Sequence, residues 1–193
     1  MADLSQLRLY ITGVTGTGKT AVAQKLTQQL ALEYIEVNTL VLEKGFYLGY
    51  DINRDSVIID DDLLIPYIES IITGKKRLCL VGGFIPLKDV FELIIVLRCG
   101  ISILKQRLIS RNYPKDKIES NLEAEIMNVV YYEAIEFFSN EKVVEVYNDK
   151  STIDDRYLQD ARYSKIRFCP MAVRKGNRSF PDPIEILMPF KLP

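Results

Sequence analysis

The feature that most constrains the fold of this chain is a glycine-rich segment, GVTGTGKT, at residues 13–20. It matches the pattern G-x-x-x-x-G-K-[ST] in full, follows a short apolar run at 8–12 and precedes apolar residues at helical spacing. A strand that runs through such a loop into a helix is the context in which these residues act together on a phosphate. The sequence therefore predicts a phosphate-binding loop near the start of the chain.

Each residue type in this loop has a physical role in binding an anion. Gly13, Gly16 and Gly18 lack Cβ atoms, so that successive N–H groups can turn toward one phosphate, and the following helix adds the positive end of its dipole. Lys19 is expected to reach the β- and γ-phosphates, and the Thr20 hydroxyl to bind Mg²⁺. The expected ligands are ATP, or a related nucleotide, and Mg²⁺.

Short apolar runs alternate with amphipathic stretches over the first 148 residues. Strands are expected at 8–12, 34–37, 77–81, 93–98 and 143–147. Helices are expected from near Gly18 through Leu30, at 63–72 with Pro66 in the first turn, and as one stripe of about six turns from Lys115 to Phe138. This alternation predicts an α/β fold of the P-loop NTPase type, with a doubly wound, parallel five-stranded sheet and flanking helices.

Composition excludes several classes of protein. The net charge of −1 gives no support for a nucleic-acid binder over the whole chain, and the absence of histidine excludes His-ligated metal sites and a His base. The apolar runs are too short to span a membrane and no secretory segment opens the chain, so a cytoplasmic protein is expected. Cys79, Cys99 and Cys169 are expected to be packing residues.

A change in composition divides the chain near residue 163. Residues 1–163 are expected to form the P-loop domain, whereas residues 164–193 hold five of the eight prolines and show no helical period. This last segment has six basic and two acidic residues, a net charge of +4. It is expected to be a basic C-terminal extension that binds a partner, although its apolar residues fit equally well with a strap packed on the domain.

The stretch 37–62 is suited to bind a second substrate. It contains aromatic side chains that can stack on a base and an arginine that can bind a phosphate, which favours a mobile acceptor-binding lid. The candidate substrate-binding residues are Asn38, Tyr50 and Arg54. The acidic run 60–62 is better explained as capping of the next helix.

Arg107 and Arg111 are candidate ATP-binding residues at the end of a further helix. Four residues apart, they fall on one helix face, from which two guanidinium groups can clamp a triphosphate or stack on adenine. As isolated residues they would instead form a solvated face. The candidate catalytic residues are Lys19 and Arg111, which can neutralise charge during phosphoryl transfer.

Five segments of the chain resemble one known family. They are ITGVTGTGKT, EKGFYLGYD, RDSVIIDDD, IIVLRC and QRLISRNYPKDKIESNLEAEI, in this order. They are similar to the adenylate kinase isoenzyme six, or CINAP, family of archaea and eukaryotes, small P-loop nucleoside monophosphate kinases that also serve small-ribosomal-subunit maturation. The resemblance implies that five loop residues bind the ATP phosphates: Gly16, Gly18, Lys19, Thr20 and Ala21.

The resemblance has further implications for site and function. It implies a monophosphate-binding part at about 36–60, a short lid at 110–120, and contact of Arg111 with ATP. It also implies AMP as the acceptor, an associated ATPase activity, and a small-subunit ribosomal protein or rRNA as partner. The expected location is then the cytoplasm, or also the nucleus in a eukaryote.

One stretch departs from the family. The family carries an acidic residue and a nearby His on the strand that follows the acceptor-site helix, where this chain has Gly82 and Phe84. Loss of the carboxylate removes a group that would hold Mg²⁺ through its water shell, unless another acid such as Asp61 is used. The first hypothesis is an ATP-dependent nucleoside monophosphate kinase with ATPase activity. The alternative, which Gly82 favours, is an ATP-binding ribosome-assembly factor with vestigial kinase turnover.

Overall fold

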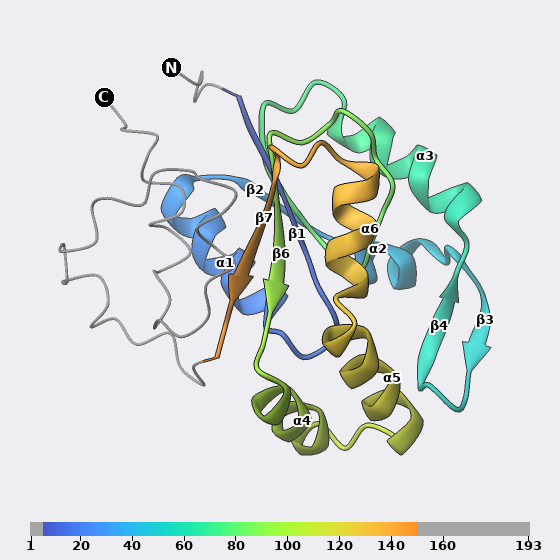
Figure 1. Cartoon of the computed structure of the whole chain (residues 1–193). Helices are drawn as coiled ribbons and strands as arrows, with labels where there is room; N and C mark the ends of the chain where they lie inside the picture. The colour runs from blue at the N-terminus through green and yellow to red at the C-terminus, as the bar shows by residue number, and fades with distance from the viewer. Residues whose placement is uncertain (1–5, 150–193) are drawn as a thin grey trace, which may run out of the picture.

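The computed structural model describes residues 6–149 and has a five-stranded parallel sheet at its centre (Figure 1). The strand order is β2-β5-β1-β6-β7, and all pairings are parallel. The strands are β1 (Leu7–Thr12), β2 (Glu33–Glu36), β5 (Arg77–Val81), β6 (Leu93–Arg98) and β7 (Val143–Tyr147). The predicted fold class is confirmed, and each predicted strand lies within one residue of its observed bounds.

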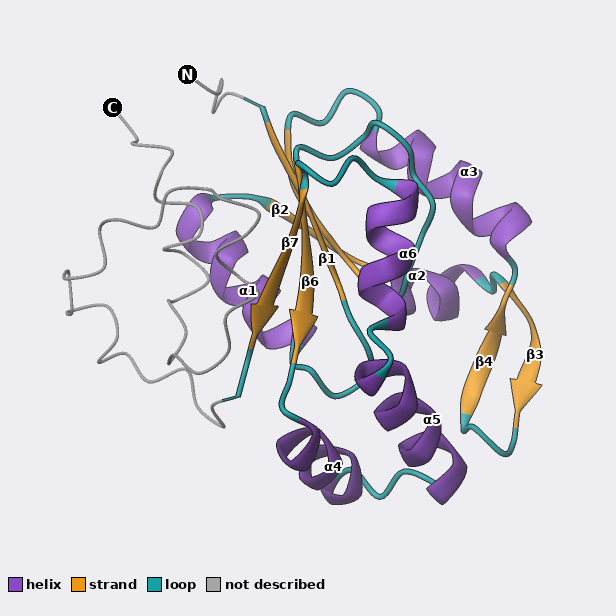
Figure 2. Ribbon diagram, in the orientation of Figure 1, coloured by secondary structure: helices purple, strands orange, loops and turns teal. Residues whose placement is uncertain are grey.

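Helices cover both faces of the sheet (Figure 2). Because side chains alternate along a strand, Leu9 and Ile11 pack with α1 (Lys19–Leu30) on one face. Tyr10 and Leu80 face the other layer, which holds α2 (Val37–Lys44), α3 (Asp61–Ile72) and α6 (Val129–Phe137). Burial on both faces explains why the strand sequences are apolar almost throughout.

Two helix predictions need correction. The stripe predicted as one helix over 115–138 is two helices, α5 (Lys115–Ile126) and α6, because Asn128 between them adopts a left-handed conformation with φ +56°. The predicted start at Lys115 is confirmed. Helix α3 begins at Asp61, so Pro66 lies inside the helix and not in its first turn. The Asp60 carboxylate caps α3 by accepting a hydrogen bond from the Leu63 N–H at 3.3 Å, which confirms the capping interpretation.

The stretch 37–62, predicted to be an acceptor-binding lid, contains a β-hairpin that is separate from the main sheet (Figure 1). It consists of β3 (Tyr47–Asp51) and β4 (Ser56–Ile59), paired antiparallel between α2 and α3. The Lys117 ammonium of α5 donates a hydrogen bond to the Asp55 carbonyl in the hairpin turn at 2.7 Å. The hairpin and α5 are therefore in contact, and the mobility of this segment stays a prediction.

Two of the three cysteines are buried and free, as expected for packing residues. Burial raises the pKa of the Cys79 thiol to about 12, and burial is also the main cause that raises the pKa of Cys99 to about 11. Cys169, the boundary near 163 and the basic extension 164–193 lie outside the described residues. Within residues 6–149, no helix has the length and apolar character needed to cross a membrane.

Candidate phosphate-binding site

The segment 13–20 joins the carboxyl end of β1 to the first turn of α1. Its three glycines have positive φ values, 141° at Gly13 and 96° at Gly16 and Gly18. A Cβ atom on Gly13 would lie 2.3 Å from the Leu97 carbonyl oxygen, so only glycine fits between this loop and β6. The strand–loop–helix context predicted for the phosphate-binding motif is therefore present.

Side chains from distant parts of the chain fix the shape of this loop. The Thr17 carbonyl accepts hydrogen bonds from Asn148 Nδ2 at 2.9 Å and from Arg107 Nη1 at 3.4 Å. The buried Thr17 hydroxyl donates to the Val14 carbonyl at 2.9 Å. Asn148 was not identified from the sequence, although its place directly after the last strand of a parallel sheet is a typical position for a functional polar residue.

The Lys19 side chain folds back over the first residues of the loop. Its Nζ donates to the Gly13 carbonyl at 2.8 Å and to the Val14 carbonyl at 3.0 Å. Burial and then the charge of Arg111 lower the pKa of Lys19 to about 8, against the opposing effect of Glu36. The Lys19 ammonium must leave these carbonyls, or share its three protons with them, to bind a phosphate.

We expect the affinity for Mg²⁺-ATP to fall as the pH rises through about 8, because Lys19 is then neutral in the free protein while the phosphates bind its charged form. Between pH 7 and pH 9 the charged fraction, and with it the affinity, falls about tenfold. Calorimetry in two buffers of different ionisation enthalpy would also detect proton uptake on binding at pH 8.5. The Lys19→Arg variant, whose side chain stays charged, is the control. Equal affinities at both pH values without proton uptake would contradict this assignment.

Thr20 has a carboxylate beside it. Its hydroxyl donates a hydrogen bond to Glu36 Oε1, at the end of β2, at 2.8 Å. Hydroxyl and carboxylate oxygens are suitable ligands for Mg²⁺, so this pair fits the ion that accompanies ATP. Residues 6–149 contain no cluster of three or more His, Cys, Asp or Glu side chains that could hold a metal ion alone. A Mg²⁺ ion at Thr20 would therefore depend on nucleotide phosphates for its remaining ligands.

Gly82 leaves no space for a side chain. A Cβ atom there would lie 2.8 Å from both Cβ and Cγ2 of Val37, so the backbone would have to shift to accept one. Asp61, suggested from the sequence as a substitute acid, is exposed in the first turn of α3. The carboxylate that contacts Thr20 belongs to Glu36 instead.

Phe84, at the family's His position, is partly buried and packs against the core. Its ring packs edge-to-face against Phe137 and Phe138, with ring centroids 5.9 and 6.0 Å apart. A phenyl ring in this aromatic cluster supplies packing and has no proton to transfer.

The two arginines of the α4 (Ile101–Ser110) region lie near the loop in different ways. Arg107 Nη1 contacts the Thr17 carbonyl and, at 3.3 Å, the Cys99 sulfur. Arg111 is the exposed residue that ends α4, and its charge contributes to lowering the pKa of Lys19. Arg107 thus contacts the loop directly, and Arg111 is close enough to Lys19 to affect its pKa.

Helix α5 closes one side of the loop. The Asn121 side-chain oxygen accepts a hydrogen bond from the Thr15 N–H at 3.0 Å, and its amide donates to the Lys117 carbonyl at 2.7 Å. The Lys117 ammonium lies 4.1 Å from the centroid of the Tyr113 ring and reaches the hairpin at Asp55. The predicted lid at 110–120 therefore corresponds to the end of α4, the connecting turn and the start of α5.

The candidate acceptor-binding residues lie on two elements that follow β2. Asn38 is exposed in α2, and Tyr50 and Arg54 lie on the hairpin. The Tyr50 hydroxyl donates to Asp55, and Arg54 Nε lies 3.9 Å from Asp51 Oδ2. Asn38 is thus two residues from Glu36, which bonds Thr20, whereas Tyr50 and Arg54 bond to residues of their own hairpin.

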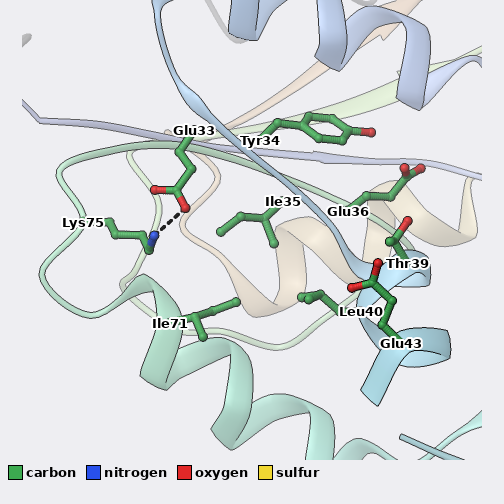
Figure 3. A pocket seen from close by; sticks show the side chains of 9 residues that line it. All are labelled: Glu33, Tyr34, Ile35, Glu36, Thr39, Leu40, Glu43, Ile71 and Lys75. Atoms are coloured by element: carbon green, nitrogen blue, oxygen red, sulfur yellow. Dashed lines mark hydrogen bonds and ion pairs between the residues drawn. The ribbon is translucent and has the colours of Figure 1, made fainter. Parts of the chain in front are cut away.

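A cavity of about 390 Å³ lies along the outer edge of β2, between α2 and α3 (Figure 3). Its lining is acidic, and its one lysine forms an ion pair with Glu33. The residues that line it are Glu33, Tyr34, Ile35, Glu36, Thr39, Leu40, Glu43, Ile71 and Lys75. Because three carboxylates outnumber one cation, this cavity is unsuited to a phosphate group.

Comparisons with known proteins show the family and the fold of this chain. A family model described as an AAA domain matches residues 9–128. A Pyrococcus furiosus protein named "Putative adenylate kinase" is 36% identical over 138 residues, which cover 72% of this chain and 73% of that protein. The "Adenylate kinase isoenzyme 6 homolog" of Dictyostelium discoideum is 34% identical over 149 residues, covering 76% and 83%. Shikimate kinase from Acinetobacter baumannii has a similar fold, with a TM-score of 0.51 at 17% identity over 75% of this chain and 86% of that chain.

Proposed function

Because the chain belongs to the adenylate kinase isoenzyme 6 family of P-loop nucleotide kinases, we propose that it transfers the γ-phosphoryl group of Mg²⁺-ATP to a nucleoside monophosphate, namely AMP. The observation that carries the proposal is the loop 13–20, with three glycines at positive φ, Lys19 folded over it and Thr20 beside a carboxylate. Such a loop binds the phosphates of a nucleotide through its N–H groups and the α1 dipole.

The described residues have distinct roles in this reaction. The loop N–H groups and Lys19 bind the β- and γ-phosphates and stabilise charge that develops during transfer. Thr20 would hold Mg²⁺, which when bound neutralises phosphate charge. Arg107, which contacts the loop at Thr17, and Arg111 at the end of α4 would bind the triphosphate, and Arg54 on the hairpin would bind the acceptor phosphate.

The contact between the hairpin and α5 supports transfer to an acceptor over hydrolysis. Lys117 joins α5 to the hairpin turn at Asp55, while Asn121 of the same helix contacts the loop at Thr15. One helix thus touches both the ATP side and the proposed acceptor side. Closure of these elements around two nucleotides would exclude water from the transferred phosphoryl group.

A second candidate function is an ATP-binding factor in small-ribosomal-subunit maturation, acting in the cytoplasm, with kinase turnover reduced. Gly82 in place of the family's acid favours this alternative. The net charge of +4 over 164–193 suits contact with rRNA or an acidic face of a ribosomal protein. Under this alternative, nucleotide binding persists while AMP has no effect on ADP formation.

A coupled assay for ADP formation from Mg²⁺-ATP, with and without AMP, separates the two candidates. We expect AMP to raise the rate well above the basal ATPase rate, because the acceptor replaces water. The Lys19→Ala protein, purified in parallel, controls for contaminating kinases. The same rate with and without AMP, or with any other nucleoside monophosphate, would overturn the kinase proposal in favour of the second candidate.

A further inference from the structure

Glu36 lies where the Mg²⁺ ion of bound ATP is expected. Thr20, the second residue of α1, donates its hydroxyl proton to Glu36 Oε1 at 2.8 Å. Glu36 is the last residue of β2 and pairs in register with Val81, the last residue of β5. Its carboxylate therefore stands at the carboxyl edge of the sheet, where ligands of parallel α/β folds bind.

Neighbouring residues show why a carboxylate comes from this strand and not from position 82. The side chain of Val37, buried at the start of α2, occupies the space into which a Cβ on Gly82 would project, 2.8 Å away. Val37 directly follows Glu36 in the chain. The turn from β2 into α2 thus fills the space beside Gly82 with an apolar side chain and brings the preceding carboxylate to Thr20.

A second carboxylate that affects Lys19, that of Glu125, is already hydrogen-bonded to other groups. Glu125 influences the pKa of Lys19, but its Oε1 accepts hydrogen bonds from Arg98 Nε at 2.7 Å and from the Cys99 N–H at 3.1 Å. Glu36, by contrast, is half-buried and interacts with two hydroxyl groups, that of Tyr34 and that of Thr20, the residue proposed to bind the metal ion.

We propose that Glu36 takes the place of the acid missing at position 82 and holds the water shell of the Mg²⁺ ion beside Thr20. The proposal rests on the ATP binding proposed above. The hydrogen bond also orients Thr20: its proton is donated to Glu36, so the lone pairs of the hydroxyl oxygen remain available to a cation. On this proposal, kinase chemistry does not require an acid at position 82 of this chain.

The test compares the affinity for ATP with and without Mg²⁺ in the Glu36→Gln variant. The amide oxygen of glutamine still accepts the Thr20 hydrogen bond, so the substitution removes the charge and little else. We expect the Kd of Mg²⁺-ATP to rise about 10–100-fold, as for other groups that orient a metal ion. The Kd of metal-free ATP, measured in EDTA, should be unchanged or lower, because a negative charge near the phosphates is lost.

Glu33→Gln is the matched control, since Glu33 lies at the other end of the same strand, where it forms an ion pair with Lys75 (Figure 3). It should leave both affinities unchanged. Titration of Mn²⁺ into the ATP complex, followed by electron paramagnetic resonance, gives a second readout that needs no turnover. Glu36→Asp, which keeps the charge, should retain more metal affinity than Glu36→Gln and serves if the glutamine variant folds poorly.

The outcomes separate this inference from the proposed function. If the native protein binds Mg²⁺-ATP and Glu36→Gln changes the Kd with and without metal by the same factor, or changes neither, the role of Glu36 is wrong and the kinase proposal stands. A change in the KM for AMP alone would also overturn the inference, because it would place Glu36 at the acceptor. Failure of the native protein to bind ATP would instead refute the proposed function.

Discussion

Lys19→Ala is expected to lower kcat about 10²–10³-fold and to weaken the binding of Mg²⁺-ATP severely. The physical reason is that Lys19 supplies a positive charge where phosphate charge accumulates during transfer, and loss of one such group from a preorganised site costs about 2.7–4 kcal/mol. In the free protein Lys19 also bonds the Gly13 and Val14 carbonyls, so its loss loosens the loop as well. Calorimetry measures the affinity, and the coupled ADP assay measures kcat.

Lys105→Ala is the matched control for this variant, because Lys105 is an exposed lysine of α4 that the site does not use. Thermal melting of both variants shows whether the fold is retained. A well-folded Lys19→Ala protein that binds ATP as tightly as the native protein would remove the basis for placing the nucleotide phosphates in this loop.

Arg98→Leu is expected to lower the free energy of unfolding by about 3–5 kcal/mol, because it leaves buried carboxylates without their cation. Arg98 is 5% exposed at the end of β6. It donates to Glu125 Oε1 at 2.7 Å and to the Glu125 carbonyl at 2.9 Å, and it also bonds Glu145 and Asn128. Burial alone would lower the pKa of Arg98, but the carboxylates of Glu125 and Glu145 have a larger, opposite effect. The pKa is therefore raised and the guanidinium stays charged.

Urea unfolding of Arg98→Leu and of Arg8→Leu tests this prediction. Arg8 pairs with Glu92 at 2.8 Å near the surface, where an ion pair contributes only about 0–1 kcal/mol. Equal losses of stability in the two variants would contradict the prediction. They would show that the bonds from Arg98 to Glu125, Glu145 and Asn128, which join β6 to β7 and to the α5–α6 turn, contribute no more than a surface ion pair.

The main sheet and the loop could be predicted from sequence because their signals are local. Strands buried on both faces have a composition that few other structures share, and the loop motif specifies its own backbone through Gly13, Gly16 and Gly18. The capping role of Asp60 is local in the same way.

Other features could not be predicted because they depend on contacts between distant segments. The apolar spacing continues without a break past Asn128, so the periodicity does not mark the end of α5. The turn between α5 and α6 is held by a hydrogen bond from Arg98, which lies on β6. The pairing of β2 with β5 brings Glu36 to the edge where Gly82 lies, and a missing acid at one sequence position therefore does not show that the site lacks a carboxylate. Asn148 reaches Thr17 only because β7 is parallel to β6.

The most direct test of the account is the fate of the γ-phosphate. The native protein is incubated with Mg²⁺, AMP and ATP labelled with ³²P at the γ-position, and the products are separated by chromatography. Transfer to AMP predicts that the label appears in ADP, as its β-phosphate, and that AMP is consumed in equal amount to ATP. Release of the label as inorganic phosphate, with AMP unchanged, would contradict the assignment of this chain as a nucleoside monophosphate kinase.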